Sequence, residues 1–206
     1  MTAAVSHVLV PPTRFGRWVD NFRGRHGDAT LAVRDGALCG EAADGSSFVA
    51  RAPFDAAYAG AAEVDAFLGA LEPPPLWGVL LVRKGGFAVA RLGGRAIAEH
   101  KVGQRHVQGR TKAGGQSQQR FARRRDNQAR QAYEAAAEHA ARILGGHRIP
   151  VVTGGDHAAV DEVLADARLS GLSPVSLWLS VSDPRRAVLD AAIADALSVR
   201  VEVVNA

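Results

Sequence analysis

The chain contains a single cysteine, Cys39, among 206 residues, so no disulfide can form within it. No apolar run approaches the roughly 20 residues of a membrane-spanning helix, and the N-terminus lacks the basic start and apolar core of a signal peptide. Neither Glu99-His100 nor Glu138-His139 is followed by the second histidine of a zinc motif. We therefore expect a cytoplasmic protein with no membrane contact, no bound metal and no other cofactor.

Acidic residues are nearly missing from residues 105–130. This segment contains seven arginines and one lysine but only one acid, Asp126. The net charge of the whole chain is +4, so the segment holds more than the entire positive excess. Such a concentration of cations favours an anionic partner such as RNA.

A proline run, Glu72-Pro73-Pro74-Pro75, predicts the boundary between two domains. Residues 1–72 are expected to form a small α+β module. Within it, Phe15, Trp18, Val19 and Phe22 share one helical face. Short strands are predicted at 31–33, 37–39 and 48–50, with turns at Asp35-Gly36 and Asp44-Gly45, and a short helix is predicted around 64–71.

The second domain is predicted to span residues 76–206 with a mixed α/β sheet. Glycine-containing turns separate three apolar segments at 77–82, 87–92 and 95–102, which is typical of an antiparallel meander. A loop at 103–117 then precedes a long helical pattern that Gly145-Gly146 ends. Strands at 149–152, 175–181 and 199–203 alternate with two helices. This order resembles the ribonuclease-H-like topology.

The most informative motif in the loop is Gly114-Gly115-Gln116. Glycine adopts backbone torsions closed to other residues and lets the chain approach a ligand closely. The Gln116 side chain offers an amide donor and a carbonyl acceptor, but it cannot act as a general base at neutral pH. It can position a water or donate to an oxyanion. Such a neutral group needs a partner molecule to complete the site.

Basic residues surround this tripeptide and are the candidate RNA ligands. The alternatives are a loop that is merely flexible and an arginine run that is a solvated helix face. The length of the loop, its charge and the helix that follows it favour phosphate contact. The candidates are Arg105, Arg110, Lys112, Arg120, Arg123, Arg124, Arg125 and Arg130.

A metal-dependent nuclease is disfavoured, because two-metal nucleases need clustered carboxylates. The three predicted strands between residues 77 and 102 carry only Glu99. Gly154-Gly155-Asp156, between a strand and a helix, lacks the lysine of a phosphate-binding loop and is interpreted as a plain turn with Asp156 as a possible cap.

The tripeptide matches the one that class I release factors use to hydrolyse peptidyl-tRNA. Three strands, an Arg-Thr-Lys-Ala-Gly-Gly-Gln-Ser-Gln loop, a long basic helix and β-α units together resemble the middle domain of the eukaryotic and archaeal release factor. More closely, the pattern resembles the actinobacterial branch of the Vms-like release factors. The resemblance covers residues 76–205 and is strongest at 110–131.

The resemblance implies a ribosome-dependent peptidyl-tRNA hydrolase, with ribosomal large subunit, 23S rRNA and peptidyl-tRNA as partners and no DNA. Gln116 would be catalytic, with Gly114 and Gly115 shaping the tip. Eukaryotic members read Gly-Gly-Ser-Gln-Ser here, so the glutamine could also register with Gln118. No codon-reading domain is visible, which favours ribosome rescue over termination. The alternative is a non-catalytic rRNA- or tRNA-binding protein with an L18/S11-like fold.

Overall fold

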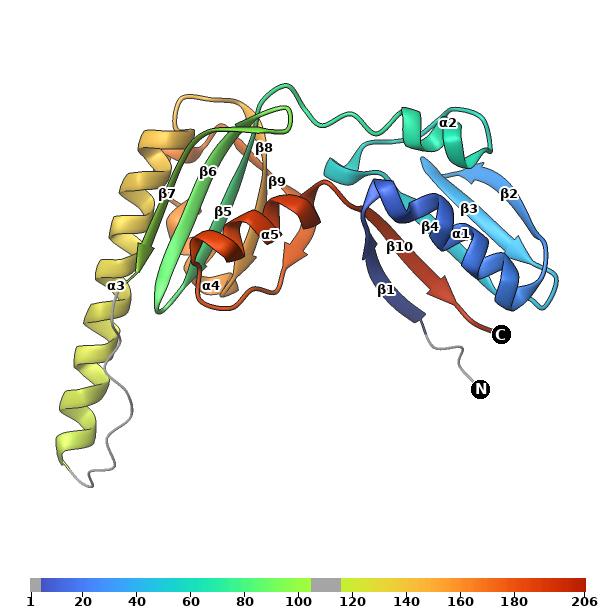
Figure 1. The fold of residues 1–206 in the computed structure, drawn as a ribbon. Coiled ribbons are helices and arrows are strands. Elements are labelled where there is room, and N and C mark those ends of the chain that lie inside the picture. Colours follow the sequence, from blue (N-terminus) through green and yellow to red (C-terminus); the bar gives the residue numbers. More distant parts are fainter. Residues whose placement is uncertain (1–4, 105–115) are drawn as a thin grey trace. The chain divides into compact units, whose positions relative to one another are not determined.

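The computed structural model describes the backbone of residues 5–104 and 116–206, together with their side chains except at 104 and 116–129. The chain forms two units (Figure 1). One comprises Met1–Pro73 with Ala194–Ala206, and the other comprises Pro74–Ile193. Each unit has its own sheet and its own hydrophobic core. The chain therefore leaves the first unit near Pro73 and returns to it at its end.

The first unit packs helix α1 on an antiparallel sheet. Its elements are β1 (Val5–Val10), α1 (Pro12–His26), β2 (Ala29–Arg34), β3 (Ala37–Ala42), β4 (Ser47–Arg51), the 3-10 turn η1 (Pro53–Asp55), α2 (Val64–Gly69) and β10 (Val199–Val204). The strand order is β1-β10-β4-β3-β2. The helical face predicted from the sequence is confirmed, because Phe15, Val19 and Phe22 are buried in this core.

Two strands of this sheet, β10 and β1, differ from what the sequence predicted. Residues 199–203 were assigned to the second domain, but β10 pairs with β1 and β4 in the first unit. Val199 and Val201 are buried there, and their alternation does not encode which sheet they join. Strand β1 was not predicted at all. It lies at the edge of the sheet, and Val5 and Val8 are exposed.

The two turns predicted in the first unit, at Asp35-Gly36 and Asp44-Gly45, are confirmed, and local backbone torsions explain them. Asp35 and Gly36 both have positive φ angles, 49° and 71°, as a tight two-residue hairpin between β2 and β3 requires. Gly45 has a φ of 90°, and the Asp44 carboxylate accepts a hydrogen bond from the Ser46 backbone at 2.8 Å. These torsions favour the residues that the sequence supplies.

The second unit contains a mixed sheet with helices on both faces (Figure 1). Its elements are β5 (Trp77–Arg83), β6 (Gly86–Gly93), β7 (Ala96–Gln104), α3 (Gln116–Leu144), β8 (Ile149–Gly155), α4 (His157–Leu164), η2 (Ala167–Leu169), β9 (Leu172–Leu179) and α5 (Arg186–Ala196), whose last three residues belong to the first unit. The strand order is β7-β6-β5-β8-β9. Strands β5, β6 and β7 form the predicted antiparallel meander, and β8 and β9 run parallel to β5. This is the ribonuclease-H-like order expected from the sequence.

Strand pairing fixes where the loop before α3 leaves the sheet. Gln104 pairs with Gly86, Gly86 with Arg83, and the neighbouring Val82 with Gly155. The end of β7 therefore lies at the same edge of the sheet as the carboxyl ends of β5 and β8. The predicted loop at 103–117 is shorter in the structure, since β7 continues to Gln104 and α3 begins at Gln116.

Candidate functional site

Helix α3 carries the candidate site at its first residue. It runs for 29 residues from Gln116 to Leu144, and Figure 1 shows its first half extending beyond the sheet. Gly114 and Gly115 of the tripeptide lie outside the described residues, as do Arg105, Arg110 and Lys112. The structure thus places the glutamine of the motif at the start of a long helix.

The second half of α3 is packed tightly on the sheet. Ala136 and Ala140 are fully buried, and their small side chains let the helix approach the sheet closely. Ile143 and Leu144 are also buried, in a cluster with Leu80 of β5. Burying a leucine or isoleucine side chain contributes about 1.5–3 kcal/mol. The apolar base of the helix is therefore its principal attachment to the domain.

A glutamate on β7 ties the base of α3 to two arginines. Glu99 forms an ion pair with Arg142 of α3, and its other oxygen lies 3.6 Å from Arg91 of β6. The Arg91 Nε also donates a hydrogen bond to the Ile143 carbonyl oxygen at 3.1 Å. A cation near the last carbonyls of a helix is favourable, because these carbonyls form the negative end of the helix dipole.

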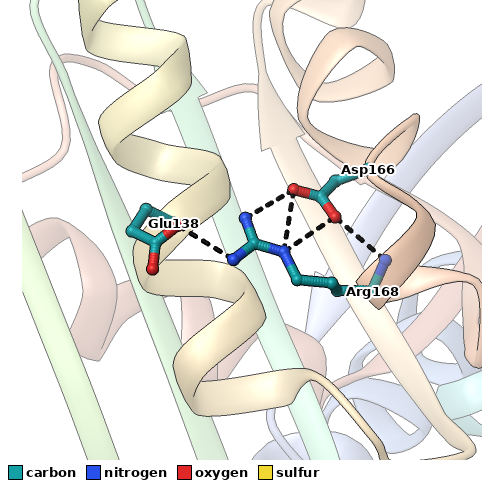
Figure 2. Close-up of polar contacts among 3 residues, drawn as sticks. All are labelled: Glu138, Asp166 and Arg168. Atoms are coloured by element: carbon teal, nitrogen blue, oxygen red, sulfur yellow. Dashed lines mark hydrogen bonds and ion pairs between the residues drawn. The ribbon is translucent and has the colours of Figure 1, made fainter.

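A second polar contact holds the packed second half of α3 (Figure 2). Arg168, from η2, donates to Glu138 of α3 at 2.9 Å and to Asp166 at 2.7 Å. The hydrogen bonds from the Arg168 side chain and backbone lower the pKa of Asp166 to about 2. The same carboxylates raise the pKa of Arg168. Asp166 therefore stays ionised at neutral pH and keeps Arg168 directed toward the helix.

His139 of the same helix lies against Phe87 of β6. Its ring stacks on Phe87 with centroids 5.4 Å apart. Partial burial lowers the pKa of His139, and Lys101 and Arg142 lower it further. The imidazole is therefore neutral at pH 7, and it packs as an aromatic group at the base of the helix.

Three of the five basic candidates on α3, at positions 120, 123 and 130, follow a helical repeat with position 116, whereas positions 124 and 125 fall on other sides of a regular helix. Positions 116, 120, 123 and 130 are separated by four, three and seven residues, so a regular helix places them on one side. Ala132, two residues beyond position 130, belongs to the buried side. Two residues correspond to slightly more than half a turn. The line from Gln116 to Arg130 therefore lies opposite the side of the helix that packs on the sheet, and Arg130 is exposed.

The remaining sequence candidates have structural explanations. Glu99 is held by two guanidinium groups, and among the described residues no group of three or more His, Cys, Asp or Glu could hold a metal ion. At Gly154 and Gly155, an added Cβ would lie 2.4 Å from the Leu179 oxygen and 2.2 Å from the Val82 oxygen. These glycines are required by close backbone packing.

Asp156 does not cap α4 with its side chain, as the sequence suggested it could. It occupies the N-cap position without a side-chain cap hydrogen bond. Its carboxylate lies 3.6 Å from Arg83 of β5, and its backbone N–H donates to the Val82 oxygen at 2.8 Å. The aspartate therefore joins the turn to β5, and the competing arginine explains the missing cap.

The residues that hold α3 were not identified from the sequence. Glu99 and Arg142 are 43 positions apart, and Arg168 and Glu138 are 30 positions apart. No local pattern signals such pairs, because only the pairing of β6 with β7 and the position of η2 bring them together. The glutamine and the arginines, in contrast, were visible as a contiguous segment.

A mixed sheet of this order that supports a long basic helix defines a release-factor-like domain. The sequence model of the Actinobacteria/chloroflexi VLRF1 release factor family matches residues 75–202, more than half of the chain, and the chain therefore belongs to this family. No curated protein matches the sequence. Among the described residues, no helix is long and apolar enough to cross a membrane. Family membership gives the protein a ribosome-associated, release-factor-like role.

Proposed function

We propose that the protein is a ribosome-dependent peptidyl-tRNA hydrolase that releases nascent chains from stalled ribosomes or large subunits. The observation that carries the proposal is the position of Gln116. It ends the Gly-Gly-Gln tripeptide and begins a helix whose other end is anchored in the core of a release-factor family domain. The loop would enter the peptidyl-transferase centre of the large subunit.

The geometry of α3 supports this reach. Among the residues of α3 whose side chains the structure describes, the first buried one is Ala132, 16 residues after Gln116. At 1.5 Å per residue, the helix can carry Gln116 about 24 Å beyond that point. A helix is stiffer than a loop, so less conformational freedom is lost when the tip enters a narrow RNA site. The ion pairs of Glu99 and Glu138 would keep this rod in a fixed direction.

The reaction proposed for the tip is hydrolysis of an ester. Water attacks the carbonyl carbon that joins the peptide to the terminal ribose of the tRNA, and the bond to the ribose oxygen breaks. The ribose oxygen takes up a proton, which leaves a free peptide acid and a free tRNA. Gln116 positions the water or donates to the developing oxyanion. Gly114 and Gly115 allow the backbone to approach, and RNA supplies the remaining groups.

The partners that fit this role are 23S rRNA and peptidyl-tRNA, in the cytoplasm. Arg105, Arg110, Lys112 and the arginines of α3 would neutralise phosphates on both sides of the tip. Each neutralised phosphate of a single strand contributes about 0.7 to the slope of log K against log salt concentration. Binding of the protein to ribosomes should therefore weaken steeply as salt is raised.

The test is release of labelled peptide from purified stalled ribosome–nascent-chain complexes. Wild type should release the peptide, and Gln116→Ala should slow release about 10²–10³-fold, as loss of one oxyanion donor does in other hydrolases. Gln118→Ala is the matched control on the same helix and should retain release. Both variants should bind the complexes as wild type does.

Three results would contradict the proposal or the role that it gives to Gln116. Binding without release by wild type would favour the non-catalytic RNA-binding alternative. Full activity of Gln116→Ala would remove the role given to this residue, and loss of activity only in Gln118→Ala would move the catalytic role to that glutamine.

A further inference from the structure

The first unit has a groove between α1 and the outer strand β1. Two adjoining hollows of about 270 Å³ and 670 Å³ form it, and both are lined by Val8, Trp18 and Asn21. We call this surface the α1–β1 groove. All of its lining residues belong to the first unit, so none of them is part of α3 or of the site proposed above.

One stripe of α1 forms a basic rim along this groove. Arg14, Arg17, Trp18, Asn21 and Arg25 recur at helical spacing and all line it. The three arginines are exposed, and in the described part of the chain none of them forms an ion pair. The lining residues of the two hollows include no acid. The rim therefore offers unneutralised positive charge beside an apolar floor.

The opposite wall is the edge of a sheet. Strand β1 comes first in the strand order and pairs only with β10, so its other backbone edge has no partner strand among the described residues. Val8, which lines both hollows, is 40% exposed. An unpaired edge of this kind accepts an additional strand.

The two walls match in length and direction. The chain turns at Pro11, so Arg14 and Arg17 lie beside Val10, whereas Arg25 lines the hollow that contains Ser6. The six residues of β1 span about 20 Å. The groove therefore presents cations near both ends and an apolar centre at Val8 and Trp18.

The tryptophan argues against a nucleic acid in this groove. Trp18 stacks on Phe15 with centroids 6.0 Å apart and on Phe22 with centroids 5.9 Å apart. These neighbours occupy the ring faces that would otherwise stack on bases. A row of free backbone N–H and C=O groups pairs instead with another polypeptide backbone.

We propose that the α1–β1 groove binds an extended acidic segment of a partner protein, which adds to the sheet as a strand beside β1. On the side that faces α1, an apolar residue sits against Val8 and Trp18. Acidic residues two positions before and after it face Arg25 at one end and Arg14 and Arg17 at the other. This binding does not depend on the hydrolase activity proposed above.

The test uses the full chain and a fluorescein-labelled probe peptide of seven residues with blocked ends. The probe has leucine at its centre, glutamate two positions to either side and threonine elsewhere. We expect saturable binding by fluorescence anisotropy, weakened about tenfold by Arg17→Glu and by Arg25→Glu. Arg51→Glu is the matched control, because Arg51 is an exposed arginine of the same unit outside the groove.

Control probes test separately the acidic residues of the ligand, its central apolar residue and its position beside β1. A probe with lysine in place of glutamate should not bind, and one with serine in place of leucine should bind about tenfold more weakly. The bound probe should slow amide hydrogen exchange in β1 but not in β2, at the other edge of the sheet. Circular dichroism verifies that the variants are folded.

The proposal is overturned if no saturable binding occurs up to about 1 mM probe, the range of a very weak complex. It is also overturned if the arginine variants bind like wild type, or if the lysine probe binds equally well. Displacement of the probe by a ten-nucleotide uridine RNA that itself binds more tightly would assign the groove to RNA instead.

Discussion

The return of the chain to the first unit predicts a selective effect for a mutation near the C-terminus. Val201 is 1% exposed and belongs to the core of the first unit, although the second unit precedes it in the sequence. Val201→Ala removes two buried carbon groups at about 0.8 kcal/mol each and leaves a cavity. We expect a loss of about 2–3 kcal/mol from the free energy of unfolding of the first unit.

Amide hydrogen exchange with mass spectrometry measures this effect segment by segment. Since 1.4 kcal/mol is a factor of ten, the slowest amides of β1, β3 and β4 should exchange roughly 30- to 150-fold faster. The slowest amides of β5 and β8 should keep their wild-type rates, because the two units have separate cores.

Two matched variants make this experiment decisive. Val152→Ala, at a residue of β8 that is 1% exposed, should accelerate exchange in the second unit and leave the first unchanged. Val204→Ala, on the same strand as Val201 but only partly buried, should have a much smaller effect. The reasoning fails if Val201→Ala accelerates exchange in β5 and β8 as much as in β4, or leaves β1 and β4 unaffected.

Three further predictions concern the second unit and the glycines. Glu99→Gln weakens the ion pairs of Glu99 with Arg91 and Arg142 at the base of α3. Because these side chains are partly exposed and screened by solvent, we expect the free energy of unfolding to fall by about 1 kcal/mol and Tm to fall by about 2–4 °C, measured by calorimetry. The pKa of Asp166 falls from 3.8 to about 2 on folding, so between these pH values the unfolded chain binds more protons than the folded chain. The stability that Asp166 contributes is therefore present above about pH 4 and is lost as the pH falls toward about 2. The difference in Tm between wild type and Asp166→Asn should vanish over this pH range. Gly155→Ala should destabilise by several kcal/mol in urea unfolding, because φ is +104° and the new Cβ would lie 2.2 Å from the Val82 oxygen, whereas Gly16→Ala, in open space on α1, should stabilise by up to about 1 kcal/mol.

Much of the second unit could be predicted because its signals are local. Glycine turns separate β5, β6 and β7, and Gly145 and Gly146 end α3: Gly145 donates to the Ala141 oxygen at 2.9 Å and Gly146 has a φ of 74°. The buried alanines of α3 recur at helical spacing. Such features depend on torsions and on neighbours within a few residues, so they can be recognised without the fold.

The contacts that position the candidate site could not be predicted in the same way. Glu99 reaches Arg142, and Arg168 reaches Glu138, only after the sheet and η2 have formed. The α1–β1 groove likewise depends on β1, whose mostly exposed residues gave no strand signal. The two ion pairs join residues 43 and 30 positions apart, and β1 is held in the sheet by β10, about 190–200 positions away.

The sequence by itself determined the tripeptide at residues 114–116, the basic segment around it and the long helix that follows. These are contiguous, and charge and helical period can be seen along a single segment. Only the tertiary structure decided which sheet takes the last strand and which pairs hold α3. The alternating valines of β10 would fit either sheet equally well, and the choice depends on partners about 150–200 residues away, in β4 and β1.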